Sequence, residues 1–181
     1  MKIKNTGING LYIIEPLVFA DARGYFFESY NKKKIEDKIS TIFVQDNQSK
    51  SSYGVIRGLH YQLNPHAQTK LVRVLFGSIL DVVVDLRRNS DTFGKVFSIE
   101  LSEENKLQLY IPKGFAHGFS VLSETAVVLY KCDELYNPDY ERGITYNDPA
   151  FNIDWKIEKG KEVISGKDAK LPTLDNAEFN F

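Results

Sequence analysis

The sequence predicts a mainly β protein, folded as a sandwich or barrel of short strands. Apolar alternations punctuated by glycine, asparagine and serine recur from about residue 11 to residue 146, which is typical of these all-β architectures. The strand candidates are rich in Val, Ile, Phe and Tyr, which pack well on a pleated surface. Hydrophobic residues make up 43% of the 181-residue chain, and this is enough for one well-packed core.

Eight segments are predicted to form strands, because each combines an apolar pattern with β-branched or aromatic residues. In chain order they are residues 10–19, 41–49, 54–63, 70–86, 95–101, 107–112, 118–122 and 126–132. Seven or eight strands favour a barrel.

Helix signals are few. Residues 31–38, NKKKIEDK, predict one or two turns of exposed helix with a solvated charged face. After residue 150 the pattern loosens, and Ser165 with Asp168 in SGKDAKLPTL predicts an N-cap before a short helix or turn. No linker, internal repeat or low-complexity segment interrupts the chain, so residues 1–181 are predicted to form a single domain.

Charge and cysteine content limit the classes of function. Lys plus Arg (23) nearly balance Asp plus Glu (24), so neither a nucleic-acid partner nor an anionic membrane surface is expected. The one cysteine, Cys132, cannot form an internal disulfide, which favours a reducing compartment. Because the chain shows no signal-peptide core and no apolar run of membrane-spanning length, we expect a cytoplasmic protein.

An arginine and a histidine stand out in the apolar segment GVIRGLHYQL. A regular strand would point Arg57 and His60 to opposite faces, because they are an odd number of positions apart. Gly58 between them can mark a one-residue bulge, which would turn both side chains to the same face. The alternative is a surface arginine and a satisfied core histidine, the more common case for an isolated histidine.

Three further blocks bear on that choice. Lys70 begins a strand whose alternate positions, Val72 and Val74, are apolar. An inward lysine needs a partner or a ligand, whereas a lysine at the rim can snorkel to water, and both alternatives stay open. In IPKGFAHGFSVL a turn delivers His117 to the next strand. Tyr130 shares a strand face with apolar neighbours and is predicted to point inward, although core packing alone would explain it.

The blocks GVIRGLHYQL and KLVRVLFG, followed by IPKGFAHG, resemble the paired signature of the cupin barrels. The resemblance implies a cupin-like jelly-roll β-barrel with a few short peripheral helices. Metal-binding cupins use three histidines and a glutamate, of which His60 and His117 match two. Gln62 replaces a histidine, and Lys70 stands where the glutamate would be. Since a divalent metal needs neutral or negative donors, the site is predicted to carry acid–base chemistry without a metal or other cofactor.

Longer blocks resemble the dTDP-4-dehydrorhamnose 3,5-epimerase family over almost the whole chain. Among them are FADARGYFFESY, VQDNQSKSSYGVIRGLHYQ, LSEENKLQLYIPKGFAHGFSVLSE and YKCDELYNPDYERGITYNDP. Members of that family invert C3 and C5 of a 4-keto-6-deoxyhexose attached to dTDP, in dTDP-L-rhamnose biosynthesis. The chemistry needs a base on one face of the sugar, an acid on the other and a group that stabilises the enolate oxygen.

The resemblance assigns these roles to four residues. His60 is the base, Asp168 orients it, Tyr130 is the proton donor, and Lys70 is the cation near the oxyanion. Without the resemblance, Asp168 would be read as the capping acid of SGKD. The resemblance also implies that Arg57 binds the diphosphate and that Tyr136 stacks on thymine. The same site would be lined by Arg23, Glu28, Gln45, Asn47, His117, Glu141 and Lys167.

Family members are dimers, so the resemblance implies a homodimer. The segment that holds Phe19, Arg23, Phe26 and Glu28 would reach towards the neighbouring subunit's site.

Several polar residues also have plain structural explanations. Glu141 would then be a turn charge, Gln45 and Asn47 would satisfy backbone groups, and His66 would be an exposed loop residue. Asp81 and Asp85 share a strand face, but the resemblance gives them no catalytic role, so they are predicted to be structural or adjacent to the substrate.

Three other functions compete with the double epimerase. A single-site epimerase would invert only C3 or only C5, and Tyr130 favours the double inversion. A catalytically inert cupin that binds nucleotide sugars is disfavoured by the joint presence of His60, Lys70, Tyr130 and Asp168. A metal-dependent oxygenase is disfavoured by Gln62 and Lys70.

Overall fold

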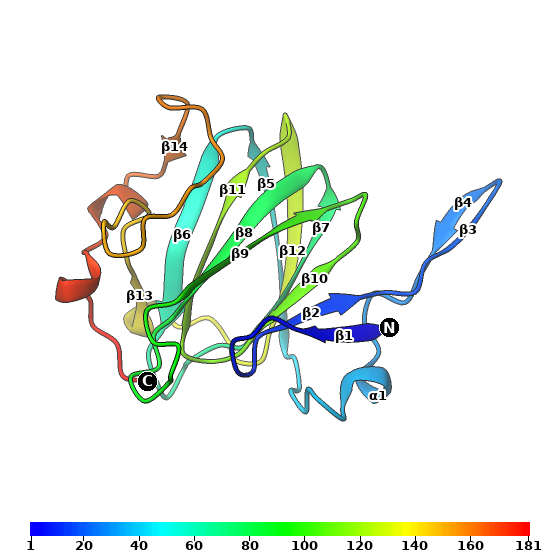
Figure 1. The fold of residues 1–181 in the computed structure, drawn as a ribbon, viewed down its shortest axis with the longest axis horizontal. Helices are drawn as coiled ribbons and strands as arrows, with labels where there is room; N and C mark the ends of the chain where they lie inside the picture. The colour runs from blue at the N-terminus through cyan, green and yellow to red at the C-terminus, as the bar shows by residue number, and fades with distance from the viewer.

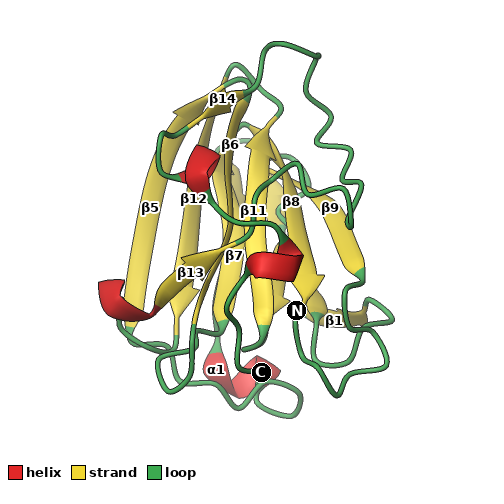
Figure 2. Ribbon diagram, turned by 90° about the vertical axis from the view of Figure 1, so that its left-hand side faces the viewer, coloured by secondary structure: helices red, strands yellow, loops and turns green.

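The computed structural model describes residues 1–181 and consists mainly of two antiparallel sheets that lie face to face (Figures 1 and 2). This arrangement confirms the predicted mainly β, jelly-roll fold, although the two sheets stay separate and do not close into one continuous barrel. None of the helices is long and apolar enough to cross a membrane.

The strands divide between the two sheets and a hairpin. The first sheet has the order β1 (Lys2–Asn5), β2 (Tyr12–Glu15), β10 (Gln108–Ile111), β7 (Lys70–Phe76), β12 (Thr125–Cys132) and β5 (Gln45–Ser52). The second has the order β13 (Glu141–Gly143), β6 (Val55–Gln62), β11 (Phe115–Val121), β8 (Ser78–Asp85) and β9 (Val96–Ser102), and β14 (Val163–Ile164) joins β6 in parallel. The hairpin of β3 (Phe19–Asp21) and β4 (Gly24–Phe26) projects away from both sheets (Figure 1).

The helical segments are short and peripheral. They are α1 (Lys32–Ile35) and three 3-10 turns, η1 (Pro138–Tyr140), η2 (Asp168–Lys170) and η3 (Leu174–Asn176). Asn31 caps α1 by accepting a hydrogen bond from the Lys34 N–H, as expected for an asparagine at this position. The predicted short helix is therefore confirmed, but Ile35 is buried, so one side of it packs on the protein.

Three apolar layers hold these elements together. The largest lies between the two sheets and includes Val72, Val83 and Val128. A second layer covers the outer face of β6, β8 and β11 with the C-terminal segment, where Trp155 is buried. A third, smaller layer packs Ile35 against the outer face of the first sheet. The chain after β13 is thus held on the back of the sheet that carries His60.

Several boundaries differ from the predicted strands: the segment predicted at 118–122 begins at Phe115, and only Tyr12–Glu15 of the segment predicted at 10–19 forms β2. Residues 70–86 form two strands, because the chain turns at Gly77 with φ of 73°. A side chain there would clash with the Thr125 carbonyl oxygen, so only glycine fits. The strand predicted from residue 41 begins at Gln45. The short strands β1, β3, β4, β13 and β14 lie outside the predicted segments or at their edge, because they are too short to show a pattern of their own.

Candidate active site

A cleft opens between the two sheets and has two connected lobes. The Arg57 lobe, about 450 Å³, is lined by Arg57, His117, Phe119 and Asp168 among others. The Tyr136 lobe, about 350 Å³, is lined by polar side chains that include Gln45, Asn47, Gln68, Tyr136 and Glu141. His60, Lys70 and Tyr130 line both lobes, so they stand where the two meet.

A bulge in β6 points Arg57 and His60 into the same cleft. His60 pairs with His117 and Arg57 pairs with Phe119, so β6 has one residue more than β11 between these two pairs. The chain adopts a φ of 117° at Gly58, where a Cβ would lie 2.6 Å from the Gly118 Cα. The predicted bulge at Gly58 is confirmed, and it requires glycine.

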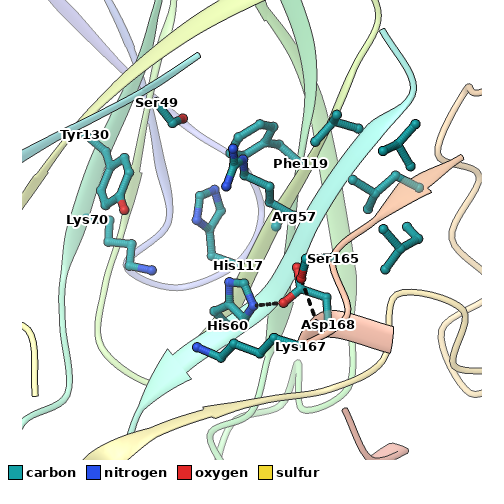
Figure 3. Close-up of a pocket in the computed structure, with 15 residues that line it drawn as sticks. Ser49, Arg57, His60, Lys70, His117, Phe119, Tyr130, Ser165, Lys167 and Asp168 are labelled. Atoms are coloured by element: carbon teal, nitrogen blue, oxygen red, sulfur yellow. Dashed lines mark hydrogen bonds and ion pairs between the residues drawn. The ribbon is translucent and has the colours of Figure 1, made fainter. Parts of the chain in front are cut away.

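His60 is hydrogen-bonded to Asp168, with 2.8 Å between His60 Nε2 and Asp168 Oδ1 (Figure 3). Asp168 Oδ2 accepts a second hydrogen bond from the Gly58 N–H at 3.3 Å. Burial raises the pKa of Asp168, but the bonds from His60 and Gly58 outweigh burial and lower it overall. Asp168 is therefore a stable carboxylate behind the imidazole.

The competing capping explanation holds for the Ser165 side chain but not for the Asp168 carboxylate. The N-cap of η2 is Lys167, not Ser165. The Ser165 hydroxyl does accept a hydrogen bond from the Asp168 N–H at 3.0 Å, which helps to hold this turn. The Asp168 carboxylate itself turns to His60 and the Gly58 N–H.

Lys70 and Tyr130 enter the cleft from the opposite sheet (Figure 3). The Lys70 ammonium lies 5.7 Å from the centre of the Tyr130 ring and has no hydrogen-bond or ion-pair partner in the chain. Burial lowers the pKa of Lys70, and the nearby Cys132 and Asp81 oppose that effect. Burial raises the pKa of Tyr130, which keeps its phenol protonated. Of the two alternatives for Lys70, the structure favours the inward one.

His117 is also paired with a carboxylate, which the sequence did not predict. His117 Nε2 lies 2.7 Å from Asp81 Oδ1, and both side chains are almost fully buried. Asp85, on the same strand face, instead binds Arg87, Ser90 and Thr92. The only sequence signal for Asp81 was the rarity of a charged side chain inside an apolar strand.

Polar contacts join the Tyr136 lobe to the C-terminal segment. The Tyr136 hydroxyl donates to Glu141 Oε2 at 2.7 Å, and Lys167 Nζ lies 2.5 Å from the same oxygen. Glu141 is therefore more than a turn charge. Gln45 accepts a hydrogen bond from the Tyr136 N–H, as its structural explanation predicted, while it also lines the lobe with Asn47.

Gln62, at the position of a cupin metal ligand, has a structural role. Its amide accepts a hydrogen bond from the Asn137 N–H and donates to the carbonyl oxygens of His66 and Leu135. It thus fixes two loops, and both polar atoms of its amide are already engaged in hydrogen bonds. No group of three or more His, Cys, Asp or Glu side chains is arranged to hold a metal ion. His66, predicted to be exposed, is half-buried against the ring of Tyr140.

The predicted site residues of the N-terminal segment do not lie in this cleft. Arg23 pairs with Asp21 at the tip of the projecting hairpin, and its side chain is 90% exposed. Glu28 pairs with Lys34 beside α1. Phe19 and Phe26 are 58% and 67% exposed on the hairpin. One copy of the chain therefore brings together every predicted site residue except Arg23 and Glu28.

The chain is similar over nearly its whole length to proteins of one known family. The family model for dTDP-4-dehydrorhamnose 3,5-epimerase matches residues 5–176. A dTDP-4-dehydrorhamnose 3,5-epimerase of Shigella flexneri is 50% identical over 181 residues, which is 99% of both chains. The chain belongs to the dTDP-4-dehydrorhamnose 3,5-epimerase family.

Solved structures of epimerases share the fold. The dTDP-4-dehydrorhamnose 3,5-epimerase of Elizabethkingia anophelis is 56% identical, covers 97% of each chain and has a TM-score of 0.92. The RmlC epimerase of Legionella pneumophila, in complex with dTDP-4-keto-L-rhamnose, is 48% identical with a TM-score of 0.92, covering 97% of this chain and 93% of that one. ChmJ, a 3'-monoepimerase of Streptomyces bikiniensis in complex with dTDP-quinovose, is 31% identical with a TM-score of 0.86, covering 93% and 85%.

Proposed function

We propose that this chain is a dTDP-4-dehydrorhamnose 3,5-epimerase. It converts dTDP-4-dehydro-6-deoxy-D-glucose to dTDP-4-dehydro-L-rhamnose by removing and returning protons at C3 and C5. One observation carries the proposal: a histidine on one sheet, bonded to the Asp168 carboxylate, and a tyrosine on the facing sheet line the same cleft, with an unpaired ammonium beside the tyrosine.

His60 is the base of the proposed reaction. The Asp168 carboxylate can only accept, so His60 Nε2–H donates to it, and Nδ1 keeps the free lone pair. The C4 ketone acidifies the adjacent C–H bonds, so His60 Nδ1 can take the proton from C3 and, after the ring is repositioned, from C5. The carboxylate behind the ring stabilises the imidazolium that forms.

Tyr130 supplies the proton from the other side. Inversion requires that the proton is returned to the face opposite to the one it left, and Tyr130 stands on the facing sheet. Its raised pKa keeps the phenol protonated until the carbanion takes the proton. Lys70, without any other partner, is placed to stabilise the negative charge on the C4 oxygen.

The nucleotide would occupy the Tyr136 lobe. Tyr136 has an exposed ring that can stack on thymine, and the amides of Gln45 and Asn47 can bind phosphate or ribose oxygens. Arg57 lines the other lobe and uses only Nε, on Ser51 Oγ, so its remaining N–H groups are free for substrate oxygens. The diphosphate contact of Arg57 stays a prediction.

A second copy of the chain would complete this lobe. Apart from Lys70, the Tyr136 lobe has no lysine or arginine in its lining, whereas a diphosphate is best bound by charge-assisted donors. The exposed hairpin carries Arg23 between Phe19 and Phe26, and this supports a homodimer in which the hairpin reaches the neighbouring site.

Mixing inactive His60→Asn and Arg23→Ala chains should then restore activity in mixed dimers. Absence of rescue between two stable dimeric variants would contradict a shared site.

The location of the proposed enzyme remains a prediction from composition. Cys132 is a buried free thiol, and the proposed nucleotide-sugar substrate fits the cytoplasmic location expected from the sequence.

The function is tested by NMR of the sugar-ring protons while the protein acts on dTDP-4-keto-6-deoxyglucose in D2O, with a reductase that traps the product. Deuterium at C3 and at C5, with L-rhamnose stereochemistry, is the expected result. No deuterium at either carbon would exclude the proposed reaction.

The second candidate is a single-site epimerase, favoured by the likeness to the 3'-monoepimerase ChmJ. It predicts deuterium at one carbon only in the same experiment. Because both functions use the same base, His60→Asn should strongly lower the rate of exchange in either case.

A further inference from the structure

Two buried side-chain polar atoms of this protein have no hydrogen-bond partner, Ser49 Oγ and Asp81 Oδ2. Both lie at the candidate active site, since Ser49 lines the Arg57 lobe and Asp81 is bonded to His117, which also lines it. Buried polar groups are almost always paired, because an unpaired one keeps the full cost of desolvation. An unpaired carboxylate oxygen in this place therefore requires an explanation.

Asp81 lies in the middle of the sheet, with no exposed surface of its own. It stands on β8, opposite Phe119 of β11 and Ile99 of β9. His117 is its one hydrogen-bond partner, at 2.7 Å. A carboxylate only accepts hydrogen bonds, so His117 Nε2 must carry the proton in this pair. His117 Nδ1 is then the unprotonated ring nitrogen, and it has no hydrogen-bond partner in the chain.

Asp85 shows what a structural carboxylate looks like on the same strand. It is equally buried, but it accepts hydrogen bonds from Arg87, Ser90 and Thr92 at 2.7–2.8 Å. Burial in this strand thus does not by itself leave an oxygen unpaired. Asp81 thus has a buried oxygen without a partner, and such costs to stability are found where function requires them.

We propose that Asp81 is a positioning residue of the epimerase, which fixes the orientation and tautomer of His117 so that His117 Nδ1 accepts a hydrogen bond from a sugar hydroxyl. The inference rests on the proposed function, because the ligand is the sugar of the substrate. Figure 3 shows His117 pointing into the cavity between Tyr130 and Arg57. The sugar would thus be held from the same strand pair that carries the base, since His117 and His60 are cross-strand partners.

The test compares Asp81→Asn with Asp85→Asn, which makes the same chemical change on the same strand. In Asp81→Asn the new side-chain amide can offer either its oxygen or its NH2 group to His117, so the tautomer is no longer fixed. We expect Asp81→Asn to lower kcat by ~10- to 100-fold and to leave the Tm unchanged or higher, because a buried unpaired charge is removed. Asp85→Asn should lower the Tm by ~5 °C or more, because Arg87 loses its partner, and should leave kcat within about 2-fold.

A double-mutant cycle tests whether Asp81 acts through His117. The double variant Asp81→Asn/His117→Asn should be no slower than His117→Asn alone. Independent, multiplicative losses would overturn the proposal. So would a folded Asp81→Asn protein with normal kcat, or an Asp81→Asn protein that unfolds, since either result would make Asp81 purely structural.

The tautomer can also be measured without turnover. The 15N shifts of the three histidine rings should show His117 with Nε2 protonated in the wild type and with a changed tautomer in Asp81→Asn. An unchanged His117 ring would overturn the inference even if the substrate were different. A wild type that exchanges no deuterium, with the expected His117 change, would instead reject the proposed function and leave the positioning role standing.

Discussion

The His60–Asp168 and His117–Asp81 pairs have their histidines opposite each other on β6 and β11 but differ in access and in the number of their partners. Their N–O distances are nearly equal, 2.8 and 2.7 Å. The His60 side chain is 27% exposed and that of His117 only 8%. Asp168 has a backbone donor for its second oxygen, whereas Asp81 has none.

A histidine–carboxylate pair therefore does not define a role by itself. His60 is open to the cleft and its carboxylate is stabilised independently, which suits a group that gains and loses a proton. His117 is enclosed and depends wholly on Asp81, which suits a group that stays in place and holds the sugar. Variants of the two histidines and of their carboxylates would separate these roles.

The two histidines themselves should differ most. His60→Asn should lower kcat by ~10³- to 10⁴-fold because the base is lost, whereas His117→Asn should lower it by only ~10- to 100-fold. His66→Asn is the matched control, since His66 lies outside the cleft, and it should leave kcat unchanged. Steady-state rates of deuterium exchange measure all three. Equal losses at His60 and His117 would remove the distinction between the pairs.

The next largest effect is expected for Asp168→Asn. It should lower kcat by ~10³-fold, because His60 can then adopt the wrong tautomer. The loss should exceed that of Asp81→Asn, since only Asp168 stands behind the base. Turnover of both variants at equal substrate concentration gives the comparison. A smaller loss at Asp168 than at Asp81 would reverse the assignment.

Tyr130→Phe tests the proposed proton donor, which lies on the sheet that faces both pairs. Removing the phenolic hydroxyl should lower kcat by ~10²-fold. The positions of His60 and His117 should not change. We expect deuterium incorporation to fall at both C3 and C5, because Tyr130 is the proposed proton donor for both inversions. NMR of the trapped sugar measures this. Full double inversion at the wild-type rate would show that another group is the proton donor.

A weaker effect concerns stability in acid. Burial raises the pKa of Asp85, but hydrogen bonds from Arg87, Thr92 and Ser90 outweigh it and lower the pKa to about 2. A carboxyl with a lowered folded pKa contributes stability above its unfolded pKa of ~3.9. That stability is lost as the pH falls through the folded value.

Between about pH 4 and about pH 2 the wild type should therefore lose ~2 kcal/mol from Asp85. Asp168, whose pKa is lowered too, should contribute in the same direction. Urea unfolding at a series of pH values checks both. The loss of unfolding free energy between about pH 4 and about pH 2 should be smaller in Asp85→Asn and in Asp168→Asn than in the wild type. A pH dependence of stability parallel to that of the wild type in either variant would contradict the role of that residue.

Local sequence patterns indicated which site residues share a strand face. Side chains alternate along a strand, so the apolar pattern groups Lys70 with Val72 and Val74, and Tyr130 with its apolar neighbours. For Lys70 this left an inward position and a position at the rim equally open. The glycine at position 58 likewise indicated the bulge that turns Arg57 and His60 to one face. These are local properties, set by the chain within a few residues of each position.

Which groups meet depends instead on the way the chain packs. Asp168 reaches His60 across 108 positions because the C-terminal segment packs on the back of the second sheet. Asp81 meets His117 because β8 and β11 are neighbours, and its second oxygen stays unpaired because no donor packs against it. The short strands β13 and β14 exist only because β6 offers them hydrogen bonds. Contacts of this kind depend on register and on the return path of the chain, and neither is encoded in the residues next to the position concerned.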